Sequence, residues 1–342
     1  HSFRPRRSSD LFAPLPVDSL LDLGGDFLVG DTVEVLGKRL GYLAGYSYKN
    51  EYRYTETTVK AYDGGGTVTV IDKDVISGVI DYQWGALVNL ALELSEDHDL
   101  KFNYLRVQSA SDEASRGTGQ QGDTTSVEDG TYMDQSVLNW TERSLSYYQL
   151  AGEHRFPELK DIRVDWGGAY SMTSQEDPDF RVFQFFSDPR NSSYNPNLTA
   201  SQPSSPTRYW RELEEENLSL RGDLTIPVPS YNDQENFVKT GAALNLSERD
   251  YFQRGISALG TSAHPFNRAG DPNMWMASTN LQYINVRNFP ANATYHGEQE
   301  IRAAYLMGDW AAFNWLRVVG GLRFESTRSE ERRVGKECRS RW

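Results

Sequence analysis

Long apolar runs are absent from this sequence, and its mean hydropathy is −0.63. A helical membrane protein needs about 20 consecutive apolar residues for each span, so that class is excluded. Positive charge is also scarce, because 35 Lys and Arg stand against 48 Asp and Glu and leave a formal net charge of −13. Nucleic-acid phosphates require a basic surface, so nucleic acid is not an expected partner. The only cysteine, Cys338, lies in a C-terminal stretch described below and gives no information on the redox compartment.

Apolar and polar side chains alternate along many segments. Between Leu40 and Thr55 the apolar residues share one parity, including Tyr42, Tyr46 and Tyr48, while charged residues occupy the other. This pattern predicts a strand with one apolar and one polar face. The segment is much longer than the usual five or six residues of a globular strand.

The same alternation predicts ten strands in all. They are expected at roughly 27–36, 40–55, 78–94, 99–109, 137–155, 161–174, 210–226, 236–250, 298–310 and 315–327. Leu145 and Tyr148 lie on opposite parities of the fifth segment, which predicts a bulge or a phase slip there.

The expected connections alternate between short and long. Short turns are expected at Gly37–Arg39, Ser95–His98, Phe156–Lys160, Pro227–Glu235 and Ala311–Asn314. Long polar loops are expected at Glu56–Ser77, Ala110–Ser136, Gln175–Tyr209 and Tyr251–Gly297. Outer-membrane barrels combine short periplasmic turns with extended external loops. The pattern therefore predicts an all-β, antiparallel, up-and-down transmembrane β-barrel, of which this chain is a part.

The two ends of the chain differ from the rest. No signal peptide opens the sequence, so we expect the natural N-terminus of an exported protein to lie upstream. Arg328–Trp342 has no alternation and resembles the translation of a sequencing-library adapter. We therefore expect residues 1–327 to be the barrel domain, and 328–342 to be read-through that no strand includes.

Three segments resemble TonB-dependent outer-membrane receptors. They are Leu36–Glu56, Glu142–Arg181 and Ala303–Thr327, which read "LGKRLGYLAGYSYKNEYRYTE", "ERSLSYYQLAGEHRFPELKDIRVDWGGAYSMTSQEDPDFR" and "AAYLMGDWAAFNWLRVVGGLRFEST". In the second, Glu176, Pro178, Asp179 and Arg181 are similar to the family's loop start.

The resemblance implies a 22-stranded barrel filled by an N-terminal plug. Such receptors import scarce nutrients, such as a siderophore, cobalamin or a glycan, with energy delivered through the inner-membrane protein TonB. The implied partners are outer-membrane lipid, the plug, TonB and the ligand. This chain contains neither a recognisable plug nor an energy-coupling box, and we expect about ten of the 22 strands. The expected location is the bacterial outer membrane.

Several residues are candidates for contact with ligand or plug. Alternation assigns six charged residues to the lumen: Arg163, Asp165, Arg221, Asp223, Arg323 and Glu325. Aromatic residues of the external loops are candidate ligand contacts: Phe183, Phe185, Phe186, Trp275 and Tyr283. These aromatic side chains either form ligand platforms or fold back on the barrel rim, and the sequence leaves both open.

No pattern in the sequence indicates catalysis or a cofactor. His98 and His154 are expected beside turns, and His264 and His296 in a loop, without the spacing of a zinc site. We therefore expect no metal, no cofactor and no enzymatic activity. The alternatives from other classes are a soluble extracellular β-sandwich or propeller that binds carbohydrate, and a passive porin.

Overall fold

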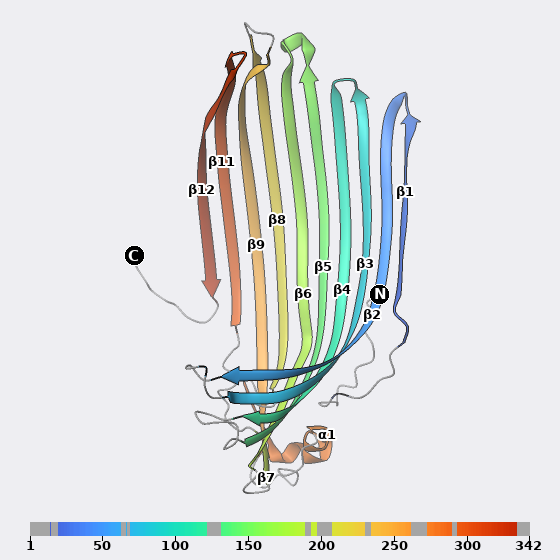
Figure 1. Cartoon of the computed structure of the whole chain (residues 1–342), viewed down its shortest axis with the longest axis vertical. Coiled ribbons are helices and arrows are strands. Elements are labelled where there is room, and N and C mark those ends of the chain that lie inside the picture. The colour runs from blue at the N-terminus through green and yellow to red at the C-terminus, as the bar shows by residue number, and fades with distance from the viewer. Residues whose placement is uncertain are drawn as a thin grey trace, which may run out of the picture.

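The chain folds into a single antiparallel sheet in the computed structural model (Figure 1). The structure describes residues 14, 20–62, 66, 69–121, 131–188, 193–196, 207–229, 234–260, 272–288 and 293–333. His264 lies outside the described residues. No helix in these ranges is long and apolar enough to cross a membrane.

Ten long strands make up the sheet, and each pairs with the next long strand in the chain. Their bounds are β1 Leu23–Val35, β2 Lys38–Tyr62, β3 Thr69–Ser95, β4 His98–Gln121, β5 Thr131–Phe156, β6 Ile162–Asp188, β8 Thr207–Val228, β9 Asn236–Gly260, β11 Ala293–Phe313 and β12 Leu316–Arg333. Each corresponds to one of the ten strands expected from alternation. The all-β, antiparallel, up-and-down arrangement is therefore confirmed.

Short elements lie between the long strands. Two short strands, β7 Ser193–Pro196 and β10 Ile284–Asn288, pair with β6 and β9. The helical pieces are η2 Pro157–Leu159, α1 Pro272–Trp275 and η3 Ser278–Tyr283. Figure 1 shows α1 and β7 together at the end of the sheet opposite the tight turns.

The strands are longer than expected at the end away from the tight turns. The expected loop Glu56–Ser77 is mostly strand, because β2 and β3 stay paired from Glu56↔Ile76 to Tyr62↔Thr69. Apolar side chains change faces in this part, because Val59, Ala61 and Ile71 lie on the odd parity, whereas the apolar residues before Thr55 lie on the even one. On the even face, Lys60 Nζ lies 3.0 Å from Asp72 Oδ2 across the strands. Backbone pairing continues through this change of parity, so uninterrupted alternation does not reveal the full length of the strands.

The expected strict alternation of short and long connections is wrong. Residues 63–68 separate β2 from β3, whereas residues 229–235 separate β8 from β9 at the end with the tight turns. The first connection is thus one residue shorter than the second. The longest connections, residues 189–206 and 261–292, still lie at the opposite end and contain β7, α1, η3 and β10.

A two-residue turn joins β1 to β2. Leu36 has φ 53° and Gly37 has φ 73°, and both are in the left-handed region. A type I′ hairpin turn requires positive φ at both central residues, and glycine adopts this conformation without a steric penalty. The turn therefore matches the right-handed twist of the strands that it connects.

The fifth strand contains a register shift, but not at the expected place between Leu145 and Tyr148, where its pairing is regular. The register between β5 and β6 shifts between Leu138 and Glu142. On the turn side of this shift the ladder is regular, and Leu150 pairs with Phe102 while Glu153 pairs with Asp165.

The last strand ends later than expected. β12 continues to Arg333, and Arg328 pairs with Glu300 of β11. The expectation that no strand includes any of 328–342 is therefore wrong for 328–333, and residues 334–342 lie outside the described part of the chain. The origin of the segment as read-through stays a prediction.

One face of the sheet is mostly apolar and uncovered among the described residues, although Glu300 and Arg302 of β11 are charged residues on it. Paired residues of antiparallel strands point to the same face, so the register aligns Tyr42, Leu90, Phe102 and Leu150 in one row. Farther along the sheet, Leu220 is 43% exposed, although its position is apolar.

Buried side chains gather at the end with the longest connections. Trp275 is 0% exposed, Phe183 is 1% exposed, and both pack with Ala258 in a small cluster that Met276 and Ile284 border. The sheet thus has a local core at one end, while most of its length is a single layer.

Candidate functional site

The polar face of the sheet carries an open hollow at mid-strand. It has a volume of about 320 Å³ and extends across β5, β6 and β8. Its lining includes Tyr147, Gln149, Asn217, Ser219 and Arg221. These side chains offer hydroxyl, amide and guanidinium groups, which suit a polar ligand or a polar stretch of polypeptide.

A glycine makes room for the arginine of this hollow. Gly167 pairs with Arg221, and a Cβ atom at Gly167 would lie 3.3 Å from Arg221 Nε. A larger side chain at this position would displace the guanidinium. The glycine therefore allows Arg221 to lie across the polar face instead of extending away from it.

The six residues expected to face the lumen lie on one face of the sheet. The register aligns Asp165, Asp223, Gly241, Tyr305 and Arg323 in a single row across five strands. Tyr305 Oη donates a hydrogen bond of 2.5 Å to Asp223 Oδ1. The shared face follows from alternation; whether a ligand or plug contacts it stays a prediction.

The remaining expected lumen residues lie on that face as well. Arg323 and Glu325 form an ion pair of 2.8 Å within β12. Arg163 and Arg221 share the parity of Asp165 and Asp223 on their own strands.

A compact network of ion pairs lies at the far end of β6. Asp179 accepts hydrogen bonds from Arg181 Nε at 2.9 Å and from Arg208 Nε at 2.7 Å. Burial raises the pKa of Asp179, but the bonds from Arg181 and Arg208 outweigh it and lower the pKa below 3.8. The guanidinium of Arg181 is 3% exposed, so this carboxylate compensates a buried charge.

The neighbouring arginine connects this network to aromatic rings. Arg211 lies over Phe180 and Tyr209, with its Cζ 5.0 Å and 5.1 Å from the two ring centroids. Asp177 is 3.8 Å from Arg211 and accepts a hydrogen bond of 2.7 Å from Thr141 Oγ1. The register between β6 and β8 shifts between Asp177 and Phe180, so the network holds a bulge in place.

The five aromatic candidates for ligand contact do not gather into one exposed platform. Phe183 and Trp275 pack edge to face, with centroids 5.3 Å apart, and both are almost completely buried. Of the two alternatives for these rings, the structure favours folding back on the sheet. Phe185 and Phe186 belong to β6, but their side chains lie outside the described ones, and Tyr283 is partly buried at the end of η3. A ligand contact of Tyr283, Phe185 or Phe186 stays a prediction.

Two histidine arrangements were missed by sequence reasoning. His98 and His154 form a cross-strand pair, with their Nδ1 atoms 3.2 Å apart, and Trp166 Nε1 donates to His154 Nε2 at 3.0 Å. His296 lies in β11 and not in a loop, and it meets Glu248 and Asp250 of β9. The spacing H-x-E at 296–298 places two side chains on one face of a strand, but the partner strand was not predictable from that spacing.

Comparisons with known proteins give no information on the function of this chain. No protein-family model, curated protein or solved structure matches this chain. The proposed function therefore depends on the two faces of the sheet and on the groups that each face presents.

Proposed function

We propose that this chain forms part of the wall of an outer-membrane β-barrel of the TonB-dependent receptor type. In its complete form, the protein imports a scarce nutrient, such as a siderophore, cobalamin or a glycan, and is not an enzyme. The apolar face contacts lipid, and the polar face lines the lumen.

The uncovered apolar face carries this proposal. Leu220 is 43%, Leu306 57% and Leu322 85% exposed, and no second layer lies over them among the described residues. A soluble β-sandwich would bury such a face against another sheet. Lipid chains satisfy an apolar band on a single sheet without a second layer, so this face favours a membrane protein over the soluble sandwich or propeller.

The polar groups of the opposite face are consistent with a water-filled barrel interior. Its mid-strand row contains Asp165, Asp223 and Arg323, and the hollow around Arg221 is lined by polar groups. In the family that the sequence resembles, a plug occupies the lumen. We propose that the hollow receives a polar segment of such a plug or the transported ligand.

The two edges of the sheet support a larger assembly. β1 pairs only with β2, and β12 only with β11, within the described part of the chain. A barrel in lipid leaves no edge unpaired, because unpaired backbone groups are costly there. Further strands therefore complete the barrel.

A matched pair of labels tests which face contacts lipid. Ser219 and Leu220 are neighbours in β8, and alternation places them on the polar and the apolar face. In a Cys338→Ser background, Ser219→Cys and Leu220→Cys are each labelled with an environment-sensitive fluorophore, and the chain is inserted into lipid vesicles. The label at 220 should emit at shorter wavelength and be quenched by a lipid-chain quencher, while the label at 219 should be quenched from water. Equal quenching at both positions would contradict the proposal.

The same positions give an energetic test. In the complete protein inserted in a bilayer, Leu220→Arg should lower the free energy of unfolding by roughly 2–4 kcal/mol, because it places a charge at mid-depth against hydrocarbon. Ser219→Arg should cost much less, since its side chain enters the polar lumen. Denaturant titration in vesicles measures both, and a larger cost at Ser219 would reverse the assigned faces.

The coding sequence of the complete protein would distinguish an energy-coupled importer from a passive porin. An upstream segment that folds as a plug and contains an energy-coupling box is the expected result. A complete gene that encodes only barrel strands would favour the porin and overturn the importer.

A further inference from the structure

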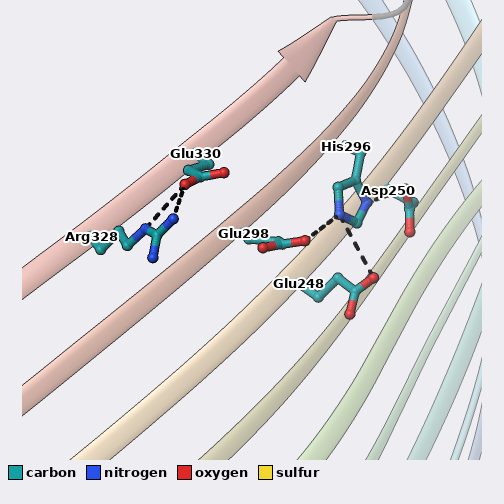
Figure 2. A network of polar contacts seen from close by, with 6 residues as sticks. All are labelled: Glu248, Asp250, His296, Glu298, Arg328 and Glu330. Carbon is teal, nitrogen blue, oxygen red and sulfur yellow. Dashed lines mark hydrogen bonds and ion pairs between the residues drawn. The ribbon is translucent and has the colours of Figure 1, made fainter.

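Four side chains form a compact cluster on β9 and β11 (Figure 2). The register pairs His296 with Asp250 and Glu298 with Glu248. Partners in an antiparallel pair, and residues two apart on one strand, share a face, so all four side chains point to the same side. The cluster lies one row beyond Leu246, where apolar side chains give way to acidic ones.

Both ring nitrogens of His296 lie close to carboxylate oxygens of the cluster. Its Nδ1 is 2.9 Å from Asp250 Oδ1. Its Nε2 is 3.1 Å from Glu298 Oε1 and 3.8 Å from Glu248 Oε1. Figure 2 shows Glu298 and Glu248 approaching the same ring nitrogen.

The atoms around His296 Nε2 are stable together only when a positive charge lies between them. When His296 is neutral and donates its Nδ1–H to Asp250, the lone pair of Nε2 faces two carboxylates. Three electron-rich atoms then meet without a hydrogen between them, which is favourable only if a proton or a metal ion lies at their centre. Arg328 lines the neighbouring hollow, but its ion pair is with Glu330, and within the described residues no Lys or Arg lies within ion-pair distance of Glu248, Asp250 or Glu298.

The distances suit a metal ion. Zinc holds nitrogen and carboxylate oxygen at about 2.0–2.2 Å, so two ligand atoms of a tetrahedral site are about 3.4 Å apart. The observed Nε2–oxygen distances of 3.1 Å and 3.8 Å lie on either side of that value. Ligand atoms of Glu248, Asp250 and His296 also lie within 4.8 Å of one another. Glu298 lies outside that group, so a rotation of its side chain toward Glu248 is needed to complete the geometry.

The carboxylate of Asp250 would contact His296 and not the metal ion itself. In protein metal sites, the histidine that binds the metal through one nitrogen usually donates its other N–H to a carboxylate, which fixes the tautomer and the ring orientation. Asp250 is placed for this at Nδ1. This pairing distinguishes the cluster from a patch of acidic residues, because the imidazole is already oriented with Nε2 toward two ligands.

The site is open to ions from solution. It borders a hollow of about 460 Å³, lined in part by Glu216, Glu248, Glu298 and Glu300. The side chain of His296 is 29% exposed, and that of Glu298 is 58% exposed. A hydrated ion therefore reaches the cluster without movement of the backbone, and water can occupy the fourth position.

We propose that His296 Nε2, Glu248 and Glu298 bind one divalent transition-metal ion of the Zn²⁺ class, with Asp250 as the positioning carboxylate. Imidazole and carboxylate together suit Zn²⁺ and its neighbours better than Mg²⁺ or Ca²⁺, which prefer oxygen alone. The cluster lies on the face that we propose contacts lipid, beyond the row of Leu246, and it does not depend on the proposed transport function.

Calorimetric titration with Zn²⁺ tests the site. The full chain is prepared in detergent without a histidine tag and freed of metal with a chelator. We expect saturable binding of one Zn²⁺ per chain, and visible absorption bands when Co²⁺ replaces Zn²⁺. His296→Gln and Glu298→Gln should each weaken binding at least tenfold, and Asp250→Asn should weaken it about 10- to 100-fold.

Glu300→Gln is the matched control. Glu300 lies on the same strand and face, two residues from Glu298, and forms its ion pair with Arg302. The substitution removes the same charge without touching His296, so binding should stay within threefold of the unsubstituted chain. Near-ultraviolet dichroism of each variant checks that the fold is unchanged.

Three results would overturn the proposal. The first is the absence of saturable Zn²⁺ binding at neutral pH, which would mean that a proton alone satisfies the cluster. The second is an equal loss in Glu300→Gln, which would indicate diffuse attraction to negative charge. The third is binding of Ca²⁺ or Mg²⁺ as tight as that of Zn²⁺, which would exclude a role for the imidazole.

Discussion

Single residues decide how side chains share the crowded polar face. Gly241 lies between Asp223 and Tyr305 in one row of the sheet. A Cβ atom at this position would collide with the Asp223 carboxylate and would lie 2.6 Å from the Tyr305 ring. The hydrogen bond from Tyr305 to Asp223 thus depends on the absence of a side chain between them.

Gly241→Ala should therefore destabilise the folded chain. The added methyl group has no space, and overpacking of this kind costs about 1–3 kcal/mol. The free energy of unfolding, measured by denaturant titration in detergent, should fall by that amount.

Gly222→Ala is the control for this prediction. Gly222 pairs with Ala242 on the neighbouring row, and a Cβ there meets nothing within 4 Å. This substitution should be neutral or slightly stabilising, because alanine loses less backbone entropy than glycine. A similar cost at both positions would show that the contact with Tyr305 is not the cause.

At the scale of the strands, the far end of β6 is held to β8 by charge. Asp179 lies within the register shift of β6, between Asp177 and Phe180, and binds Arg181 and Arg208. Backbone pairing is interrupted here, so the side chains supply the connection between the strands.

Acid should weaken this connection. The pKa of Asp179 is lower in the folded chain than the ordinary value of 3.8. A lowered pKa means that the ionised carboxylate stabilises the fold above that ordinary value, and that this stabilisation is lost as the pH falls below it, through the pKa of the folded state. Stability measured against pH should show this loss as a steep acid limb.

Asp179→Asn should flatten that limb and lower stability near neutral pH by about 1–3 kcal/mol, because charge-assisted hydrogen bonds are lost beside a buried guanidinium. Asp26→Asn, at an exposed position of β1, serves as the control. An unchanged acid limb in Asp179→Asn would show that the Asp179 carboxylate does not cause the loss of stability in acid.

At the scale of the whole molecule, a single layer with two unpaired edges governs solution behaviour. The apolar face is open, and β1 and β12 each have one partner strand among the described residues. Both features favour association with another surface, whether lipid, detergent or another copy of the chain.

The isolated chain should therefore aggregate in buffer and disperse in detergent. Sedimentation with and without detergent measures the difference, and vesicle flotation measures lipid association. A monodisperse monomer in buffer, with sharp near-ultraviolet dichroism, would instead favour a soluble β protein.

Alternation was enough to place all ten long strands and to divide their side chains between two faces. It works because the period of two is a local property, and one apolar environment along a face imposes it on each strand separately. The up-and-down order of the strands was also expected, and in the structure each long strand pairs with the next one, even across the long connections 189–206 and 261–292. The charged residues Asp165, Asp223 and Arg323 were assigned to a common face for this reason.

The features that local pattern did not reveal all depend on pairing between distant segments. The extension of β2 and β3 beyond Thr55 and Ser77 depends on the backbone ladder, which continues where the apolar side chains change parity. The burial of Phe183 against Trp275 joins β6 to α1, and the meeting of His296 with Glu248 requires the register of β9 and β11. Contacts of this kind depend on which residues lie opposite one another, and backbone hydrogen bonding between strands, not the chemistry of any one segment, decides that.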